Sequence, residues 1–286
     1  MTTPTIATPH VEVDPNVLDE GFSRQDFPLR HNLADNPLFS LEAIAELADS
    51  MPEGQVEHNL GDLPEELPDG APPQADLTPG EIARGIETNR CWMVLKRIEF
   101  NPQYREMLQS LLGPIAERVG PREGGATRFE AYIVLSAPNS TTPVHIDPEH
   151  NFFMHIKGPK RFDVGSWGDD DESGLTAMKR YYGDNHRYVD RMPDGANSYN
   201  LEPGDGLYLP PHAPHMVKTF DPVAISLSCA MYTKELEDLV SLFRMNSQLE
   251  KMRLPVAPPG RHPTSDRAKA AVWRNLRKAV RSVSRG

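Results

Sequence analysis

Cysteine is scarce in this chain, and its scarcity excludes two classes of protein. The 286 residues contain only Cys91 and Cys229, too few for a disulfide framework or a thiolate metal site. This usage suits a reducing compartment, so we expect a cytoplasmic protein. Long apolar runs are also lacking: no stretch approaches the roughly 18 residues that span a bilayer, and no signal peptide is visible at the N-terminus.

Positive charge is in short supply as well, and it is unevenly placed. The net charge of -11 argues against a generic nucleic-acid binder. Residues 251–286 nevertheless hold ten Lys or Arg against one Asp, a balance of +9 that leaves -20 for the rest of the chain. We therefore expect an acidic body with a basic tail, which forms a surface helix or docks on a partner subunit.

The first half of the chain divides into two segments. Residues 1–35 are polar and lack periodicity, which predicts a flexible N-terminal arm pinned at Phe22 and Phe27. Residues 36–127 mix helices and strands and form the N-terminal part of the main domain. In this part Asn101-Pro102 starts a helix, and Gly113-Pro114 is expected to stop it. The Pro- and Gly-rich stretch from Gly61 to Pro79 is predicted to be a loop.

The second half changes to short strands and then to helices. Residues 128–232 read as many short strands separated by Gly/Pro turns, which favours a sandwich or a barrel. Residues 233–286 contain an apolar-faced helix from Glu235 to Met252 and a basic helix from Ser265 onward. The expected class is mainly β with flanking helices. An acidic run from Asp169 to Glu172 reads as a solvated loop rather than a metal site.

One stretch carries the strongest chemical signal. His145 and Asp147 are two residues apart in an expected strand, so their side chains point the same way. A second expected strand ends in Pro210-Pro-His-Ala-Pro-His215, which supplies a further imidazole. Two imidazoles and one carboxylate on one face of an ion are the facial triad of non-haem Fe(II) oxygenases. The sequence therefore predicts that His145, Asp147 and His215 bind Fe(II) and are the catalytic centre.

Three other histidines compete for the same role. His212 lies three residues before His215 and is the alternative third ligand. His150 and His155 are expected to form hydrogen bonds around the site rather than to bind the ion.

The residues around this stretch resemble a known family. Thr142-Pro-Val-His-Ile-Asp147, Asn151-Phe-Phe and Gly158-Pro-Lys160-Arg-Phe look like the core of JmjC and cupin-like oxygenases. The similarity is greatest to the asparaginyl hydroxylase that inhibits hypoxia-inducible factor and to bacterial cupin-like proteins. It implies a double-stranded β-helix, or jelly roll, that uses Fe(II) and takes 2-oxoglutarate as co-substrate.

The resemblance also assigns residues to the co-substrate. It implies that Thr142 and Lys160 bind the far carboxylate of 2-oxoglutarate and that Asn151 lies near it; Tyr132 is a candidate for the family's tyrosine ligand. An ammonium that meets a carboxylate in a pocket agrees with the expected role of Lys160. The sequence departs from the family at His212-Ala-Pro214, where a glycine and an aromatic pair are usual. It departs again at Ser226-Leu-Ser228, where an asparagine is usual.

The function implied is that of a dioxygenase that hydroxylates a protein or peptide side chain with molecular oxygen. Asp147 favours hydroxylation, since related halogenases have a small residue in its place. Three alternatives stay open: a small-molecule hydroxylase of the same class, a non-enzymatic metal-binding cupin scaffold, and a cupin isomerase or dioxygenase independent of 2-oxoglutarate. The resemblance further implies a homodimer formed through the C-terminal helices, with the helix from Glu235 to Met252 as the candidate surface. Nucleic-acid binding is disfavoured.

Overall fold

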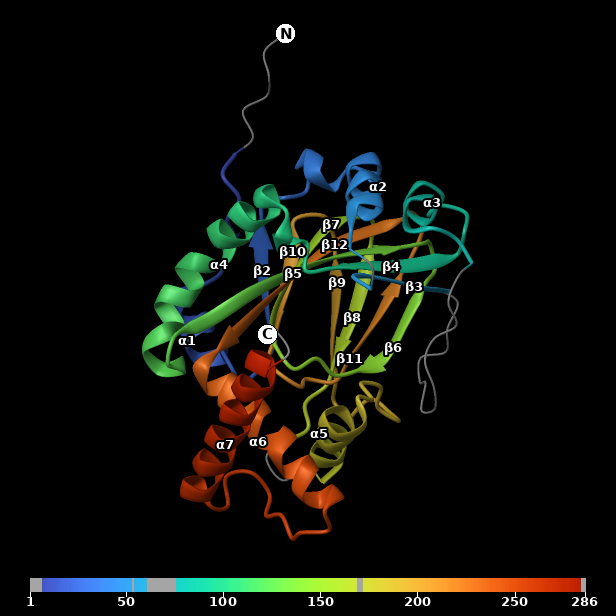
Figure 1. Ribbon diagram of the computed structural model, residues 1–286. Helices are drawn as coiled ribbons and strands as arrows, with labels where there is room; N and C mark the ends of the chain where they lie inside the picture. The colour runs from blue at the N-terminus through green and yellow to red at the C-terminus, as the bar shows by residue number, and fades with distance from the viewer. Residues whose placement is uncertain (1–6, 53, 61–75, 169–171, 284–286) are drawn as a thin grey trace.

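The computed structural model describes residues 7–52, 54–60, 76–168 and 172–283, and Figure 1 shows their arrangement. The acidic run from Asp169 to Asp171 and most of the loop predicted over 61–79 lie outside these residues. The described strands are β1 Val11–Glu12, β2 Phe27–His31, β3 Val56–Leu60, β4 Cys91–Lys96, β5 Ala126–Ser136, β6 Thr141–His145, β7 His150–Lys157, β8 Lys160–Val164, β9 Asn197–Leu201, β10 Asp205–Leu209, β11 His215–Thr219 and β12 Ala224–Thr233. The helices are α1 Pro15–Gly21, α2 Leu41–Ser50, α3 Pro79–Arg84, α4 Pro102–Glu123, α5 Glu172–Asp184, α6 Lys234–Lys251 and α7 Pro263–Val283, with short 3-10 turns at Pro37–Phe39 and Ile98–Phe100.

The strands form two antiparallel sheets that face each other. The large sheet has the order β1-β2-β10-β7-β12-β5-β4-β3, and the small sheet has the order β6-β11-β8-β9. From β5 to β12 the chain alternates between the two sheets, apart from the step from β8 to β9. This winding is the double-stranded β-helix that the resemblance implied, so the predicted fold is confirmed.

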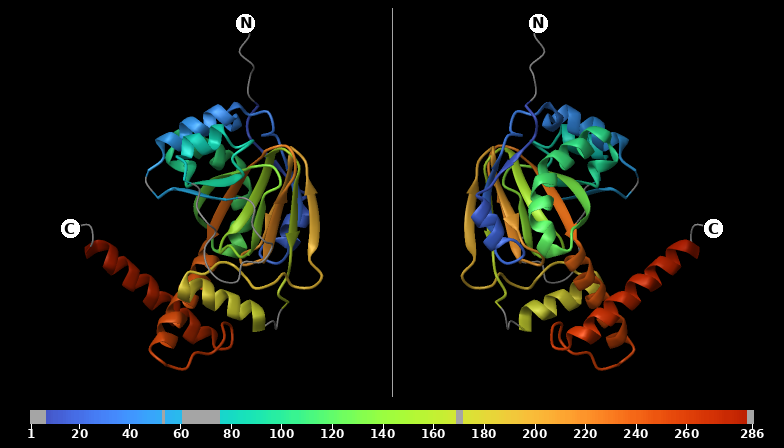
Figure 2. Two further views of the ribbon diagram at one scale, coloured as in Figure 1. Left: turned by 90° about the vertical axis from the view of Figure 1, so that its right-hand side faces the viewer. Right: turned by 90° about the vertical axis from the view of Figure 1, so that its left-hand side faces the viewer.

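The two faces of the large sheet pack against different parts of the protein. Phe152 and Phe153 are neighbours on β7, and because strand residues alternate, they join different cores. Phe152 belongs to the largest core, which the sheet forms with α2, α3 and α4 on one side of the molecule (Figure 2). Phe153 packs between the two sheets with side chains such as Phe162 and Leu209. The metal motif lies in this inner space.

The third group of helices closes one end of the strands. In Figure 1, α5, α6 and α7 lie together below the sheets. α6 contacts both α5 and α7, while α7 contacts mainly α6. Figure 2 shows α7 leading away from the body of the protein toward the C-terminus. Among the described residues, no helix is long and apolar enough to cross a bilayer.

The prediction of a loose N-terminal arm is wrong for the described residues of that segment. β2 pairs with β10 and extends the large sheet. Phe22 and Phe27 are buried, and both rings stack on Tyr208 of β10. The sequence hid this strand because only three alternate residues, Phe27, Leu29 and His31, face inward.

The predicted end of the helix that starts at Asn101 is also wrong. The Asn101 side chain caps α4 as expected, accepting a hydrogen bond from the backbone of Gln103. The helix then continues past Pro114 and ends at Gly124, whose φ of 70° is left-handed. Ile115 and Val119 lie beyond the expected stop and are buried. Their packing outweighs the hydrogen bond that a proline removes from the helix.

Candidate metal centre

Two neighbouring strands bring the predicted ligands together. β6 and β11 pair so that His145 lies opposite His215, and Asp147 follows directly after β6. The Nε2 atoms of His145 and His215 lie 3.7 and 3.6 Å from Oδ2 of Asp147. One donor atom from each residue fits within 4.8 Å of the others. The sequence prediction that these three side chains converge is therefore met by the geometry.

Backbone carbonyls fix the protonation of both imidazoles. His145 Nδ1 lies 2.8 Å from the carbonyl of Pro143, and His215 Nδ1 lies 2.9 Å from that of Ala213. A carbonyl only accepts, so each Nδ1 carries the proton and each Nε2 keeps its lone pair. Burial lowers the pKa of both histidines and keeps them neutral. Two neutral imidazole nitrogens and one carboxylate oxygen are a donor set that fits Fe(II).

Asp147 stays ionised despite its burial. Burial works against its charge, but the neighbouring Arg187 guanidinium favours the ionised form, and the pKa of Asp147 falls to about 2. Arg187 donates from Nη2 to Oδ1 of Asp147 at 2.9 Å. The other oxygen, Oδ2, is the one that faces the imidazoles.

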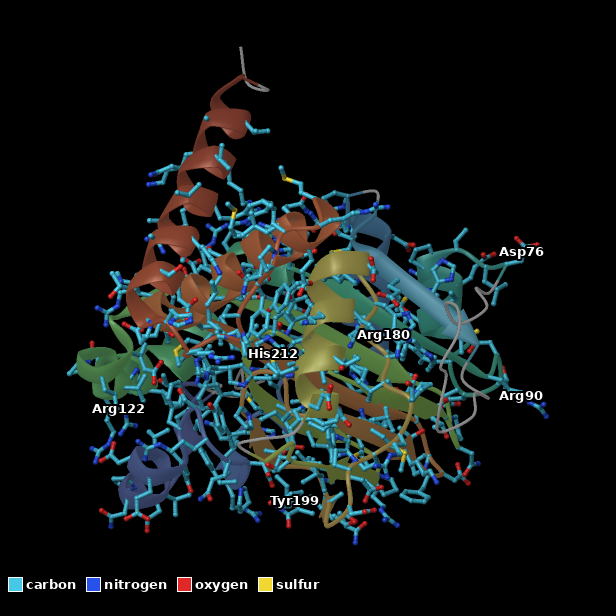
Figure 3. All side chains as sticks on the ribbon, turned by 90° about the horizontal axis from the view of Figure 1, so that it is seen from below. Asp76, Arg90, Arg122, Arg180, Tyr199 and His212 are labelled. Atoms are coloured by element: carbon cyan, nitrogen blue, oxygen red, sulfur yellow. The ribbon has the colours of Figure 1, made fainter. Side chains whose placement is uncertain are left out.

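The competing histidines are turned to other partners. His212 Nε2 pairs with the hydroxyl of Tyr182 at 2.7 Å, and Figure 3 shows His212 beside α5 near the centre of the view. His150 Nδ1 pairs with the hydroxyl of Tyr208 at 2.8 Å. His155 Nδ1 pairs with the hydroxyl of Ser226 at 3.0 Å. None of the three belongs to the ligand cluster found among the described residues.

A cavity of about 300 Å³ opens beside the three ligands. Its wall includes all four residues predicted for the co-substrate, together with a set of aromatic and charged side chains. The main lining residues are Glu57, Trp92, Lys96, Tyr132, Thr142, Glu149, Asn151, Phe153, Lys160, Tyr181, Arg187, Tyr188, Ser228 and Tyr232.

Lys160 is the most buried cation in this wall, with 2% of its surface exposed. Its Nζ donates to Ser226 Oγ at 2.8 Å, and burial lowers its pKa to about 7. Ser226 is oriented in turn: His155 Nε2 faces the carbonyl of Gly158 and must donate to it, so Nδ1 accepts from the Ser226 hydroxyl at 3.0 Å. The Ser226 oxygen is thereby left with its lone pairs toward Lys160.

The other predicted co-substrate residues lie in the same wall with defined partners. Asn151 accepts a hydrogen bond from Ser228 at 2.9 Å, and Tyr132 donates to Glu130 at 2.6 Å. Thr142 lines the cavity from β6. Ser226 and Ser228, which depart from the family pattern, thus orient Lys160 and Asn151.

Sequence reasoning missed two ionisable residues of this wall, Glu149 and Arg187. Glu149 is 8% exposed and accepts a hydrogen bond from the Tyr232 hydroxyl at 3.4 Å. Burial, followed by the charge of Asp147, raises its pKa to about 8. His145, Asp147 and Glu149 are each two residues apart, so continuing the spacing of the first two would have pointed to Glu149. Arg187 stands in a polar segment after α5 and had no comparable signal.

The chain is similar to known proteins in its family pattern and in its fold. A family model described as a JmjC domain matches residues 123–239. No curated protein sequence gives a significant match. An X-ray structure of Escherichia coli YcfD is similar, with 19% identity, a TM-score of 0.54, and coverage of 94% of this chain and 68% of that chain.

A second solved structure carries ligands. It is the ribosomal oxygenase YcfD from Escherichia coli in complex with cobalt and 2-oxoglutarate, with 20% identity and a TM-score of 0.50. The match covers 92% of this chain and 65% of that one, so the chain spans about two thirds of the length of these proteins. At such identity the likeness supports the fold.

Proposed function

We propose that the protein is an Fe(II)- and 2-oxoglutarate-dependent oxygenase that hydroxylates a protein or peptide side chain, a proposal that the match of a JmjC-domain model to residues 123–239 supports. The observation that carries the proposal is the convergence of His145, Asp147 and His215 beside the buried ammonium group of Lys160. A metal site alone would fit many proteins, but a buried lysine next to it calls for an anionic partner.

The three ligands would hold the metal through His145 Nε2, His215 Nε2 and Asp147 Oδ2. When bound, Fe(II) together with 2-oxoglutarate and O₂ supplies the oxidising chemistry, in which the co-substrate becomes succinate and CO₂ while the substrate gains a hydroxyl group. The chain's own part is to keep both imidazoles neutral through the Pro143 and Ala213 carbonyls and to keep Asp147 charged.

Lys160 would bind the far carboxylate of 2-oxoglutarate. A carboxylate within hydrogen-bond distance favours the ammonium form, which offsets the burial that now depresses the pKa of Lys160. Ser226 holds Nζ in place, and Thr142 would add a hydroxyl donor. Asn151 and Tyr132 would complete the wall around the co-substrate.

The rest of the cavity wall would receive the substrate. It combines aromatic rings with the Glu149 carboxyl group and the charged Arg187 guanidinium close to the ligands, which suits a polar side chain better than an apolar molecule. The name of the Escherichia coli protein, a ribosomal oxygenase, supports a protein substrate. A small-molecule substrate and a metal-binding scaffold without turnover are the alternatives.

The test is iron-dependent turnover. Purified protein with Fe(II), ascorbate and 2-oxoglutarate is expected to form succinate, measured by NMR, even without its substrate and at a low rate. His145→Ala is expected to form none above background. Binding of N-oxalylglycine in the presence of Mn(II), measured by calorimetry, is expected to be lost in Lys160→Ala. A wild-type protein that binds the metal but forms no succinate would favour the scaffold.

We further propose a homodimer formed through the C-terminal helices, in the cytoplasm. The expected surface, the helix from Glu235 to Met252, corresponds to α6, but α5 and α7 flank α6. α7 instead exposes an apolar stripe, with Val272, Leu276 and Val280 exposed by 47%, 52% and 68%. The stripe on α7 is therefore the better surface for a second copy. Cys91 and Cys229 are free and buried, which suits a reducing compartment.

A further inference from the structure

The segment from His186 to Val189 runs beside the strand that carries the metal motif. Ile146 donates its backbone N–H to the carbonyl of Arg187 at 3.0 Å, and Val189 donates to the carbonyl of Val144 at 3.1 Å. An antiparallel bridge joins His145 and Tyr188 between them. This segment follows α5 and lies some 40 residues after the motif, yet it is held to β6 like a short additional strand.

The backbone contacts bring the Arg187 side chain to one oxygen of Asp147. Nη2 of Arg187 lies 2.9 Å from Oδ1, while the imidazole nitrogens face Oδ2. The Asp147 side chain is 20% exposed and that of Arg187 is 37% exposed, and both residues line the cavity. The main chain of Asp147 is fixed as well, since its carbonyl accepts from the backbone N–H of His212 at 2.7 Å.

The two oxygens of Asp147 therefore have different partners: Oδ1 accepts from Arg187, and Oδ2 faces the imidazoles. A free carboxylate can bind a metal through one oxygen or through both, and the second mode takes up one more coordination position. A bound metal would need three open positions for the proposed reaction, two for 2-oxoglutarate and one for O₂, opposite the three protein atoms. A charge-assisted hydrogen bond to Oδ1 opposes the two-oxygen mode and fixes the rotation of the carboxylate.

We propose that Arg187 is a positioning residue of the metal centre, which restricts Asp147 to one ligand oxygen and so keeps the third position open. The inference rests on the proposed function for the identity of the metal and the co-substrate. It assigns to the segment between α5 and β9 a part in building the centre, although that segment supplies no ligand.

The test is direct metal binding in the absence of 2-oxoglutarate. Co(II) is titrated into the metal-free protein, and its affinity is followed by calorimetry and its geometry by the visible absorption spectrum. Arg187→Gln is expected to weaken Co(II) binding about 10- to 100-fold and to alter the spectrum, because the freed carboxylate can bind through both oxygens. Arg187→Lys keeps a charged donor, so its Co(II) affinity is expected to lie between those of the wild type and Arg187→Gln.

Asp190→Asn is the matched control. Asp190 directly follows the His186–Val189 segment, and the change removes its exposed ion pair with Arg180 of α5 without altering a residue of the cavity wall. The Co(II) affinity and spectrum of this variant are expected to equal those of the wild type. Circular dichroism of each metal-free variant confirms that it is folded.

Two results would point to different failures. If the wild type binds Co(II) and Arg187→Gln binds it equally well with the same spectrum, the role of Arg187 is refuted while the proposed function stands. If the folded wild type itself binds no Co(II), the metal centre and the proposed function fail together.

Discussion

Lys160 is a buried cation whose contacts are uncharged. Ser226 accepts its hydrogen bond, and the Phe153 ring lies 5.1 Å away. Because burial lowers its pKa to about 7, the folded protein binds fewer protons at this group than the unfolded chain does between pH 7 and the usual lysine value of about 10.4. The contribution of Lys160 to the free energy of unfolding therefore grows as the pH rises through this interval.

The same pKa makes co-substrate binding depend on pH. A carboxylate bound to Lys160 restores the ammonium form, so binding of N-oxalylglycine above pH 7 takes up a proton, and the affinity falls by up to about tenfold per pH unit. Calorimetry at pH 8 in two buffers of different ionisation enthalpy measures this uptake. In Lys160→Arg, where the guanidinium is always charged, no uptake at this group is expected. Binding of N-oxalylglycine to the wild type without proton uptake would contradict a pKa of about 7 for Lys160.

The ligands could be read from the sequence, whereas Arg187 could not. His145 and Asp147 are two residues apart in an expected strand, and this spacing alone fixes their common direction. His215 required one more assumption, that a second strand returns to the same place; the strand was expected to end at His215, whereas β11 begins there, after the Pro-rich turn that follows β10. Arg187 reaches Asp147 only because the segment after α5 pairs with β6, and this pairing leaves no periodic pattern in the sequence.

β2 completes one side of the large sheet and ties the N-terminal segment to the core. Phe27 lies opposite Tyr208 in the register of β2 and β10. The rings of Phe27 and Tyr208 stack at 4.5 Å between centroids, and Phe22 stacks on His150 at 4.4 Å. The N-terminal segment is thus part of the folded unit from β1 onward.

Phe27→Ala is expected to lower the free energy of unfolding by about 3–5 kcal/mol, because it opens a cavity in the core beside Tyr208. Urea unfolding followed by fluorescence or circular dichroism measures the change. Arg24→Ala, an exposed position before the same strand, is expected to stay within about 0.5 kcal/mol of the wild type. If Phe27→Ala were as stable as the wild type, Phe27 would not pack in the core, and the N-terminal segment would be a loose arm.

The predictions for elements failed where tertiary contacts override local signals. Gly113-Pro114 is a strong local stop, yet α4 continues because Ile115 and Val119 pack into the large core. β2 has few apolar residues, yet it forms because β10 offers it an edge. The β-helix strands were easier to predict, since Gly or Pro lies in most of the turns between them.

The protein as a whole separates its charges between a compact acidic body and a basic terminal helix. α7 carries six Lys or Arg against one Asp, and one of them, Arg274, forms an ion pair with Asp238 of α6. The apolar stripe of α7 lies on a part of the helix that leads away from the body (Figure 2). Such a stripe is available to a partner.

Leu276→Asp is expected to convert the proposed dimer to a monomer, because it places a charge in the middle of the stripe. Light scattering after gel filtration is expected to give twice 32.0 kDa for the wild type and 32.0 kDa for the variant. Val17→Asp changes an apolar residue on α1 that is 37% exposed, and it is expected to leave the mass at the dimer value. A wild type that is monomeric at micromolar concentration rules out the dimer.

The cavity wall is built from two separate parts of the chain. Glu57, Trp92 and Lys96 come from β3 and β4, whereas the metal-binding side chains come from β6, β11 and the turn after β6. Substitutions in β3 and β4 can therefore reshape this part of the cavity wall without changing the residues of the proposed metal centre. Grafting β3 and β4 from a protein of the same fold is accordingly a route to a different substrate with the same proposed reaction.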